Sequence, residues 1–593
     1  AISVAVAVVA VENSAGTTVR AAIEDGSGLD AGGNVAVSAE NTTKISTVGV
    51  AASISVSASS GSVGISGAGS VVVTNSTMTN AVMAEVSGSN LSNVGNVSVT
   101  ANDKAEIDTV GVAAAISAGV SSGVSVSLAV SVTLASIAAQ TATLARISDS
   151  TITNPGIVNV FARSDTDINT VAVAASVSVA VGSNAAIGVA AAVVRTNVSG
   201  YDYDDGSDTF SFLPGTQIAG TTEASILGGS ITGASSVDVH AYGTNTITTT
   251  AVSVAAAVSV SSNAAISLAV AVGVAEVDMA HAVLAKIGDD AVVSASGAVD
   301  VDAANVIGPI SNPDRMEIDT VSISAVLSVA GSGSFALAGA GAGATATNNV
   351  TGSVEAEVDG ATITANQLTV DALDRTDVST LSVAAAAAIA VSGTAAISLA
   401  GAVAISRTEY QMTTQAAILS SQINQLGSSV LRVQATSDAE LDTLAVGVAV
   451  AISASGTASV AAAFGVSIAE ANVSSSTVAL IGADSVIDTE GSVLVRAYDQ
   501  MVVDTDTVAV SLSVAVSGVA GIGVSVSVAT ASNTYGAMVQ SKLSDSDVDA
   551  EGNVSVTADS IAEIEVDGIG VAVAVGGGTV GIAGSVAAAI TST

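Results

Sequence analysis

The stretch Ile168–Val194, INTVAVAASVSVAVGSNAAIGVAAAVV, decides the fold of this chain. Its two apolar runs are joined at Gly182-Ser183-Asn184, and residue types alternate along each run with a period of two, as in a β-strand. Valine at every second position favours a strand, because its branched side chain packs well on a pleated surface. One face of the first run carries Val171, Val173, Ala175, Val177, Val179 and Val181, and the other carries Ala172, Ala174, Ser176, Ser178 and Ala180. The second face is small enough for another layer to approach it closely.

The same pair of runs recurs along the chain. It returns from Thr109, Ala251, Leu381 and Thr507, each time with a joint of small, turn-prone residues. A second marker, of the form G-x-V-x-V-x-A with variations, recurs at intervals of 61 to 63 residues, except for two intervals of 79 and 69 residues. The alanines that end this marker are Ala39, Ala101, Ala162, Ala241, Ala303, Ala372, Ala435, Ala497 and Ala558. Such fixed spacing within one chain indicates tandem repeats.

We therefore predict an all-β fold in which repeats of about 61 residues form a β-solenoid, giving an elongated rod or fibre. A stack of antiparallel hairpins is the alternative, because the joints are only two or three residues long. We expect backbone ladders and dry layers of Val and Ala to hold the repeats together. Residues 1–593 form one continuous array with partial units 1–39 and 559–593. The units between them are 40–101, 102–162, 163–241 (insert about 199–222), 242–303, 304–372 (insert about 304–315), 373–435, 436–497 and 498–558.

Composition and charge narrow the function. Aromatic residues make up 2% of the chain and Cys is absent, so disulfides and thiolate metal sites are excluded. The formal net charge of −39 argues against binding to nucleic acid. The apolar runs are broken by turn residues and alternate with a period of two, which argues against a membrane-spanning helix. We expect the chain not to span a membrane.

The longer insert concentrates the residues that could bind a ligand. Asp202, Asp204, Asp205 and Asp208 surround Gly206, and hard carboxylate oxygens on a turn suit Ca²⁺, which is the one candidate cofactor. A hydrated acidic loop tip is the alternative. Tyr201, Tyr203, Phe210 and Phe212 lie in the same insert and would form a partner-contact patch if they are exposed. If they fold back, they only anchor the loop.

No catalytic arrangement is indicated. His240 and His281 are the only histidines, and His240 occupies a marker position that is polar in other repeats, so we expect it to face solvent. Asp108, Asp319, Asp442 and Asp504 recur at one position of the repeat, which indicates a solvated structural position. We therefore predict that the chain is not an enzyme.

The repeats resemble those of giant bacterial surface and exported proteins rich in β-strand repeats, the filamentous-haemagglutinin-like adhesins. The resemblance is carried by SDSTITNPGIVNVFA (Ser148–Ala162), DSDVDAEGNVSVTA (Asp545–Ala558) and the Ala/Val strand pair after each. It implies export to the cell surface or beyond, and a role in adhesion or surface coating. We expect a structural extracellular filament, sheath or stalk whose partners are copies of itself. The alternative is an adhesin that binds a receptor, a glycan or a neighbouring cell through its inserts.

Overall fold

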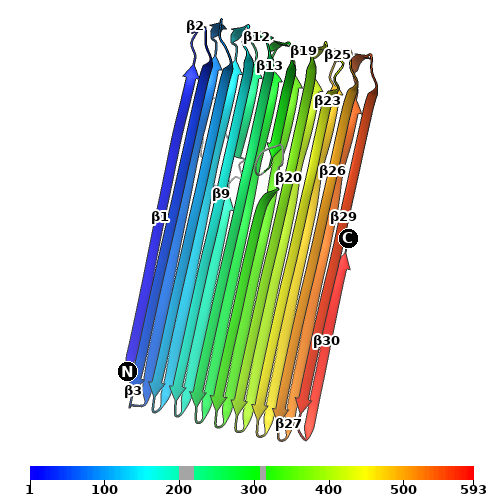
Figure 1. Cartoon of the computed structure of the whole chain (residues 1–593). Helices are drawn as coiled ribbons and strands as arrows, with labels where there is room; N and C mark the ends of the chain where they lie inside the picture. The colour runs from blue at the N-terminus through cyan, green and yellow to red at the C-terminus, as the bar shows by residue number, and fades with distance from the viewer. Residues whose placement is uncertain (200–219, 307–314, 593) are drawn as a thin grey trace.

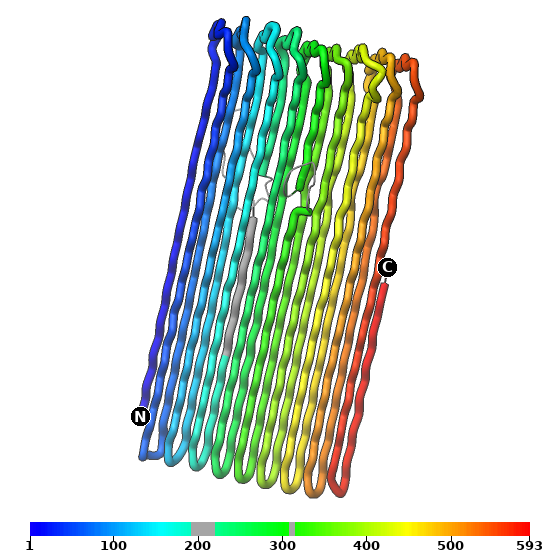
Figure 2. The backbone as a smooth tube through the Cα atoms, in the orientation of Figure 1, coloured from blue at the N-terminus to red at the C-terminus, as the bar shows by residue number. Residues whose placement is uncertain are grey.

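The protein is a β-solenoid in which every coil runs through three parallel sheets. The computed structural model describes residues 1–199, 220–306 and 315–592, and within these ranges it contains strands and no helix. Figure 1 shows two wide sheets of long strands, with short strands gathered at one end and tight turns at the other. Figure 2 follows the chain coil by coil from the blue side of the array to the red side.

The A sheet and the C sheet are the two wide layers, and the B sheet is narrow. The A sheet contains β1 (Ile2–Ile23), β4 (Val63–Ser87), β7 (Val124–Ser148), β10 (Ala185–Ser199), β11 (Gly220–Leu227), β14 (Ala264–Gly288), β18 (Phe335–Asp359), β21 (Ala395–Leu419), β24 (Ala458–Gly482), β27 (Ala520–Leu543) and β30 (Val580–Ser592). The C sheet contains β3 (Val35–Ser59), β6 (Val97–Ser121), β9 (Ile157–Gly182), β13 (Ser236–Ser261), β16 (Ala298–Asn305), β17 (Met316–Ser332), β20 (Gln367–Ser392), β23 (Leu431–Ser455), β26 (Val493–Ser517) and β29 (Val554–Gly577). The B sheet contains β2 (Gly28–Asp30), β5 (Asn90–Ser92), β8 (Thr151–Thr153), β12 (Ser230–Ala234), β15 (Val292–Ala295), β19 (Thr362–Ala365), β22 (Gln422–Gln425), β25 (Ser485–Thr489) and β28 (Ser546–Ala550).

Successive coils pair in parallel and in register. All nine marker alanines, from Ala39 to Ala558, lie opposite one another in a single row of the C sheet. The solenoid prediction is therefore confirmed and the hairpin alternative is wrong. The two runs that flank each joint lie in different sheets, and each pairs with its equivalent in the next coil instead of with the other run.

The proportions of a coil follow from its strand lengths. A typical long strand has 25 residues, which corresponds to roughly 80 Å at about 3.3 Å per residue. Each added coil lengthens the array by only about 4.8 Å. This part of the chain is therefore a flat slab, wider across its coils than it is long.

The core differs between the two ends of the slab. Near the B sheet it is built from Val, Ile, Leu and Met, including the fully buried Ile107, Ile152 and Val160. Near the tight turns it consists mainly of alanine, as at Ala388 and Ala451. The wide sheets can approach each other here because the facing side chains are small.

Serine hydroxyls form hydrogen bonds directly between the two wide sheets in this alanine-rich part of the core. Ser70 donates to the carbonyl oxygen of Ala51 at 2.7 Å, and Ser267 donates to that of Ala257 at 2.7 Å, in both cases from the A sheet to the C sheet. A Cβ atom at Gly447 would lie only 2.6 Å from the carbonyl oxygen of Val466 in the facing sheet. The layer is held by close contacts between small side chains and backbone.

The predicted Val/Ala layer is only half correct. In β9, Ala172, Ala174, Ser176, Ser178 and Ala180 are buried between the sheets, while Val171, Val173, Val177, Val179 and Val181 lie on the outer face. The reason is steric, since alternating valines on the inner face would hold the sheets too far apart for the serine contacts. The acidic segments that precede the apolar runs are themselves part of the long strands.

Candidate functional site at the two insertions

The predicted calcium and contact residues lie outside the part of the chain that the structure describes. These are Asp202, Asp204, Asp205 and Asp208 for calcium, and Tyr201, Tyr203, Phe210 and Phe212 for partner contact. The structure does define where the insertions join the solenoid. The longer one connects β10 to β11 in the A sheet, and the shorter one connects β16 to β17 in the C sheet.

Both insertions join the array at the same level along the strands. β11 begins at Gly220, which pairs with His281 of β14. β16 ends at Asn305, which pairs with Gly243 of β13. Gly243 and His281 face each other across the core, because a Cβ atom at Gly243 would lie 2.3 Å from the His281 Nε2 atom. The two insertions therefore join opposite faces of the slab at one height, with the coil of β13 and β14 between them.

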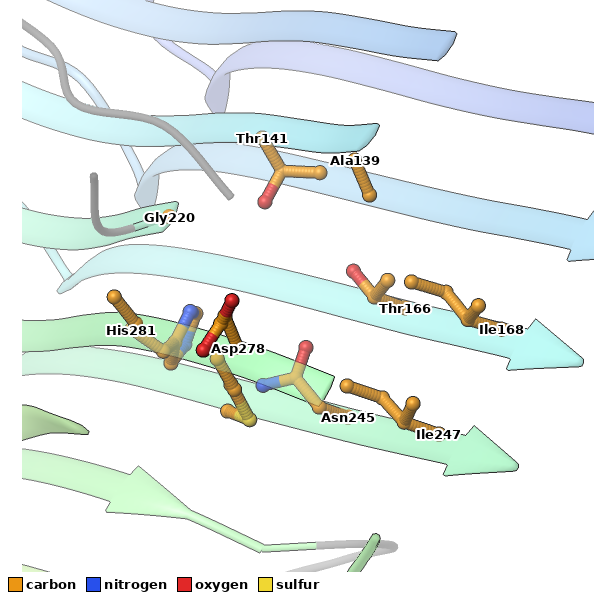
Figure 3. Close-up of a pocket in the computed structure, with 11 residues that line it drawn as sticks. Ala139, Thr141, Thr166, Ile168, Gly220, Asn245, Ile247, Asp278 and His281 are labelled. Carbon is orange, nitrogen blue, oxygen red and sulfur yellow. The ribbon is translucent and has the colours of Figure 1, made fainter. Parts of the chain in front are cut away.

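A small cavity lies at this level, with a volume of about 40 Å³. Figure 3 shows the side chains that surround it, which come from strands of both wide sheets. The lining residues are Ala139, Thr141, Thr166, Ile168, Gly220, Asn245, Ile247, Asp278, Met279, Ala280 and His281. A space of this size holds a few water molecules, whereas organic ligands usually occupy about 300–1,000 Å³.

His281 is the buried titratable group of this cavity. Its side chain is almost fully enclosed, and burial lowers the pKa of its imidazole to about 4. The imidazole is therefore neutral at physiological pH. No hydrogen-bond partner for its Nε2 atom occurs among the described residues, and a water molecule in the cavity would satisfy that atom.

His240 lies on the outer face of the C sheet, but only 24% of its side chain is exposed, so the prediction that it faces solvent is only partly correct. Its Nε2 atom is 3.3 Å from Asp302 Oδ2, and its ring stacks on Tyr242 with centroids 5.8 Å apart. Asp302 belongs to an outer carboxylate cluster that also includes Asp238, Asp300 and Asp371. The sequence signal for this cluster was the shared repeat position of its members, since Asp238 pairs with Asp300, and Asp302 pairs with Asp371.

The outer carboxylate cluster is short of positive charge. Burial, followed by the carboxylates of Asp371 and Asp300, raises the pKa of Asp302 to about 8. Burial also raises the pKa of Asp371 to about 6, although its ion pair with Arg432 opposes this shift. Burial lowers the pKa of His240. Burial therefore favours the uncharged form of both partners in this close contact.

The recurring acids form a row on the outer face of the C sheet. Asp319, Ser379, Asp442 and Asp504 are successive partners in the register, so the predicted single repeat position is confirmed. A groove of about 300 Å³ runs along this row in the last coils, with Asp442, Asp504 and Asp506 in its lining. Within the described ranges, no group of three or more His, Cys, Asp or Glu side chains is arranged to hold a metal ion.

A second set of aspartates lies inside the slab, where the large-residue core meets the alanine layer. Asp103 accepts hydrogen bonds from Asn41 at 2.7 Å and Asn80 at 3.1 Å. Asp374 accepts one from the Tyr410 hydroxyl at 2.5 Å. Burial raises the pKa of both aspartates, while these hydrogen bonds act in the opposite direction. Sequence reasoning missed this set, although Asp103 and Asp374 each follow a marker alanine by two residues and therefore share its buried face.

Comparison with known proteins gives no relative. No family model matches the chain, and neither a curated protein nor a solved structure is significantly similar to it. Among the described residues there is also no helix long and apolar enough to cross a membrane.

Proposed function

We propose that the chain is a structural scaffold of the cell exterior, a segment of a filament, sheath or stalk that performs no catalysis. The observation that carries the proposal is the continuous register of the coils, from β3 to β29 in the C sheet and from β1 to β30 in the A sheet. Each coil contacts its neighbours through two long ladders, so stiffness is a property of the whole array. A stiff array of identical coils is suited to a structural role.

Charge pairing between coils supports the same role. Lys44 pairs with Glu106, and Arg407 pairs with Glu470 at 2.7 Å, in each case across one step of the stack. Both basic side chains thus offset an acidic neighbour within the array. The large remaining negative charge keeps the surface soluble and favours separation of neighbouring arrays at low salt.

Immunogold labelling of intact source cells tests the proposal. Antibody raised against the 593-residue chain should label filaments or a coat outside the cell. Negative-stain microscopy of the purified chain should show flat particles about 80 Å wide. Label confined to the cytoplasm, or round particles without a flat form, would contradict the proposal.

An adhesin that binds through its insertions is the second candidate function. The observation in its favour is that both insertions join the slab at one level along the strands, one on each face. Deletion of 200–219 together with 307–314 would remove this feature. Attachment to cells or glycans that is lost while surface filaments persist would support the adhesin, and unchanged attachment would exclude these loops as its binding elements.

A further inference from the structure

The outer face of the C sheet carries an apolar field. It is formed by the outward residues between the acidic row and the tight turns, which in β9 run from Val171 to Val181. In central coils these side chains stay exposed although coils flank them on both sides, as at Val254 (40%), Leu327 (42%) and Val391 (50%). Contiguous apolar surface of this size on a soluble protein marks an interaction site.

The field is large enough to hold a stable partner. Eleven residues along a strand correspond to roughly 33 Å, and the strands of the C sheet form nine successive coils, which span roughly 43 Å at about 4.8 Å each. One copy therefore offers roughly 1,400 Å², and two copies would cover about 2,800 Å² in total, which exceeds the 1,200–2,000 Å² typical of stable interfaces. Polar side chains interrupt only the first row, at Thr250 in β13 and at Asp506 and Asp567 in β26 and β29.

The surface of the field is uneven, because it contains both a hollow lined by small side chains and larger apolar side chains. Near its centre lies a hollow of about 380 Å³. Small alanines form its floor, with Ala325 beside Ala385 and Ala387 beside Leu327 in the register. Leu327 lies between Ala256 and Ala387 in one row of the hollow, so a copy related by a two-fold axis would set this large side chain against small ones. Protein interfaces of high affinity are built from such pairs of knobs and pockets.

We propose that the apolar field of the C sheet docks on the same field of a second copy of this chain. The inference deepens the scaffold proposal, on which it rests, by naming lateral association as the way in which arrays assemble. Like meets like in this arrangement, so no other protein is required. The acidic rows that border the field oppose association by charge repulsion, and added salt therefore strengthens it.

A lipid bilayer fits the field less well. The row next to the field carries Asp319, Asp442 and Asp504, which repel anionic headgroups. Tyr and Trp, which typically mark a membrane interface, do not flank the field in the described coils. The hollow lined by alanines would also contribute nothing specific to binding a bilayer, because fluid lipid chains adapt to any surface shape.

Sedimentation velocity of the full chain over a concentration series tests the proposal. The wild-type chain should associate, and more strongly at 0.5 M than at 0.05 M salt. The triple variant Val254→Thr/Leu327→Thr/Val450→Thr keeps β-forming residues but removes apolar surface from the field. Its association should be weaker by roughly a hundredfold, because each loss counts twice in a two-fold interface.

The matched control is Leu373→Thr/Leu494→Thr/Val502→Thr, which removes outward apolar residues from the acidic half of the same sheet. It should associate like the wild type, and both variants should keep the wild-type circular dichroism spectrum. A wild-type chain that stays monomeric at high salt, or equal weakening by both variants, would overturn the inference. Flotation of monomers with vesicles of zwitterionic or anionic lipid, lost in the field variant alone, would assign the field to a membrane instead. Flat particles in micrographs of a chain that stays monomeric would leave the scaffold proposal standing while this inference fails.

Discussion

Enlarging one inward alanine should damage the slab, while the same change at the next residue should not. Ala388 is fully buried in the alanine layer, between Ser328 and Ala451 of the neighbouring coils. Ala387 follows the opposite direction of the pleat and lies on the outer face. Replacement of either by leucine adds the same three carbon atoms, so the pair of variants isolates the effect of the layer.

The size of the stability loss in Ala388→Leu depends on how far the alanine layer can expand. Overpacking of a well-packed core costs about 1–3 kcal/mol, and more where the surroundings are rigid. Here the facing surfaces are backbone and small side chains, tied across the gap by bonds such as Ser453 to the carbonyl oxygen of Ala396 at 2.7 Å. We therefore expect Ala388→Leu to destabilise β20 and β21 locally by about 3 kcal/mol, which is roughly a hundredfold change in an equilibrium constant.

Native-state hydrogen exchange is the appropriate assay, because a long repeat array need not unfold in one step and a single melting temperature would average over it. Amides of β20 and β21 should exchange about a hundredfold faster in Ala388→Leu. In Ala387→Leu the free energy of local opening at the same amides should change by less than about 0.5 kcal/mol, as for an ordinary surface substitution. Equal exchange in the two variants would refute the close approach of the wide sheets at this level.

Three further predictions address other parts of the array. The free energy of unfolding should fall as pH rises from 5 to 8. The carboxyl of Asp302 has a folded-state pKa of about 8 and so binds a proton more tightly than in the unfolded chain. Asp302→Asn should flatten this dependence in urea titrations at pH 5 and pH 8. Gly393→Ala should destabilise its turn by about 1 kcal/mol or more, because its Cβ atom would meet the carbonyl oxygen of Gly333 at 2.2 Å. Gly61→Ala, with its nearest contact at 3.4 Å, should be tolerated, and native-state hydrogen exchange of the turn amides compares the two variants. Deletion of 200–219 should abolish any calcium binding seen by isothermal titration calorimetry, and binding that persists would place calcium elsewhere in the chain.

Much of the fold could be predicted from residue spacing alone. The marker alanines at Ala39, Ala101 and their equivalents set the repeat length, and parallel stacking then places them in one row because each coil repeats the path of the last. The alternation in Val171–Val181 specified a strand. It also indicated that another layer could approach the small face closely, as the structure shows. It did not indicate that the valines of the other face stay outside, because larger apolar residues normally lie in the core.

The site was less predictable, for physical reasons. The level shared by the two insertions depends on how the A and C sheets face each other, as at Gly243 and His281, and no spacing along the chain encodes that. The burial of Asp103 depends on Asn41 and Asn80, one in the preceding coil and one in the facing sheet. The outer carboxylate cluster could have been found from the shared repeat positions of Asp238 and Asp300.

Disulfide trapping in this cysteine-free chain tests the central claim, the parallel in-register stack, most directly. Ser379 and Asp442 are partners in the register and both point outward. Their Cα atoms should lie about 4.8 Å apart, within the range that a disulfide spans. Ser379→Cys/Asp442→Cys should therefore form an intramolecular disulfide on mild oxidation. Ala390→Cys/Ile397→Cys, whose positions would pair if the joint closed an antiparallel hairpin, should remain reduced. Bond formation by the second pair and not by the first would contradict the solenoid.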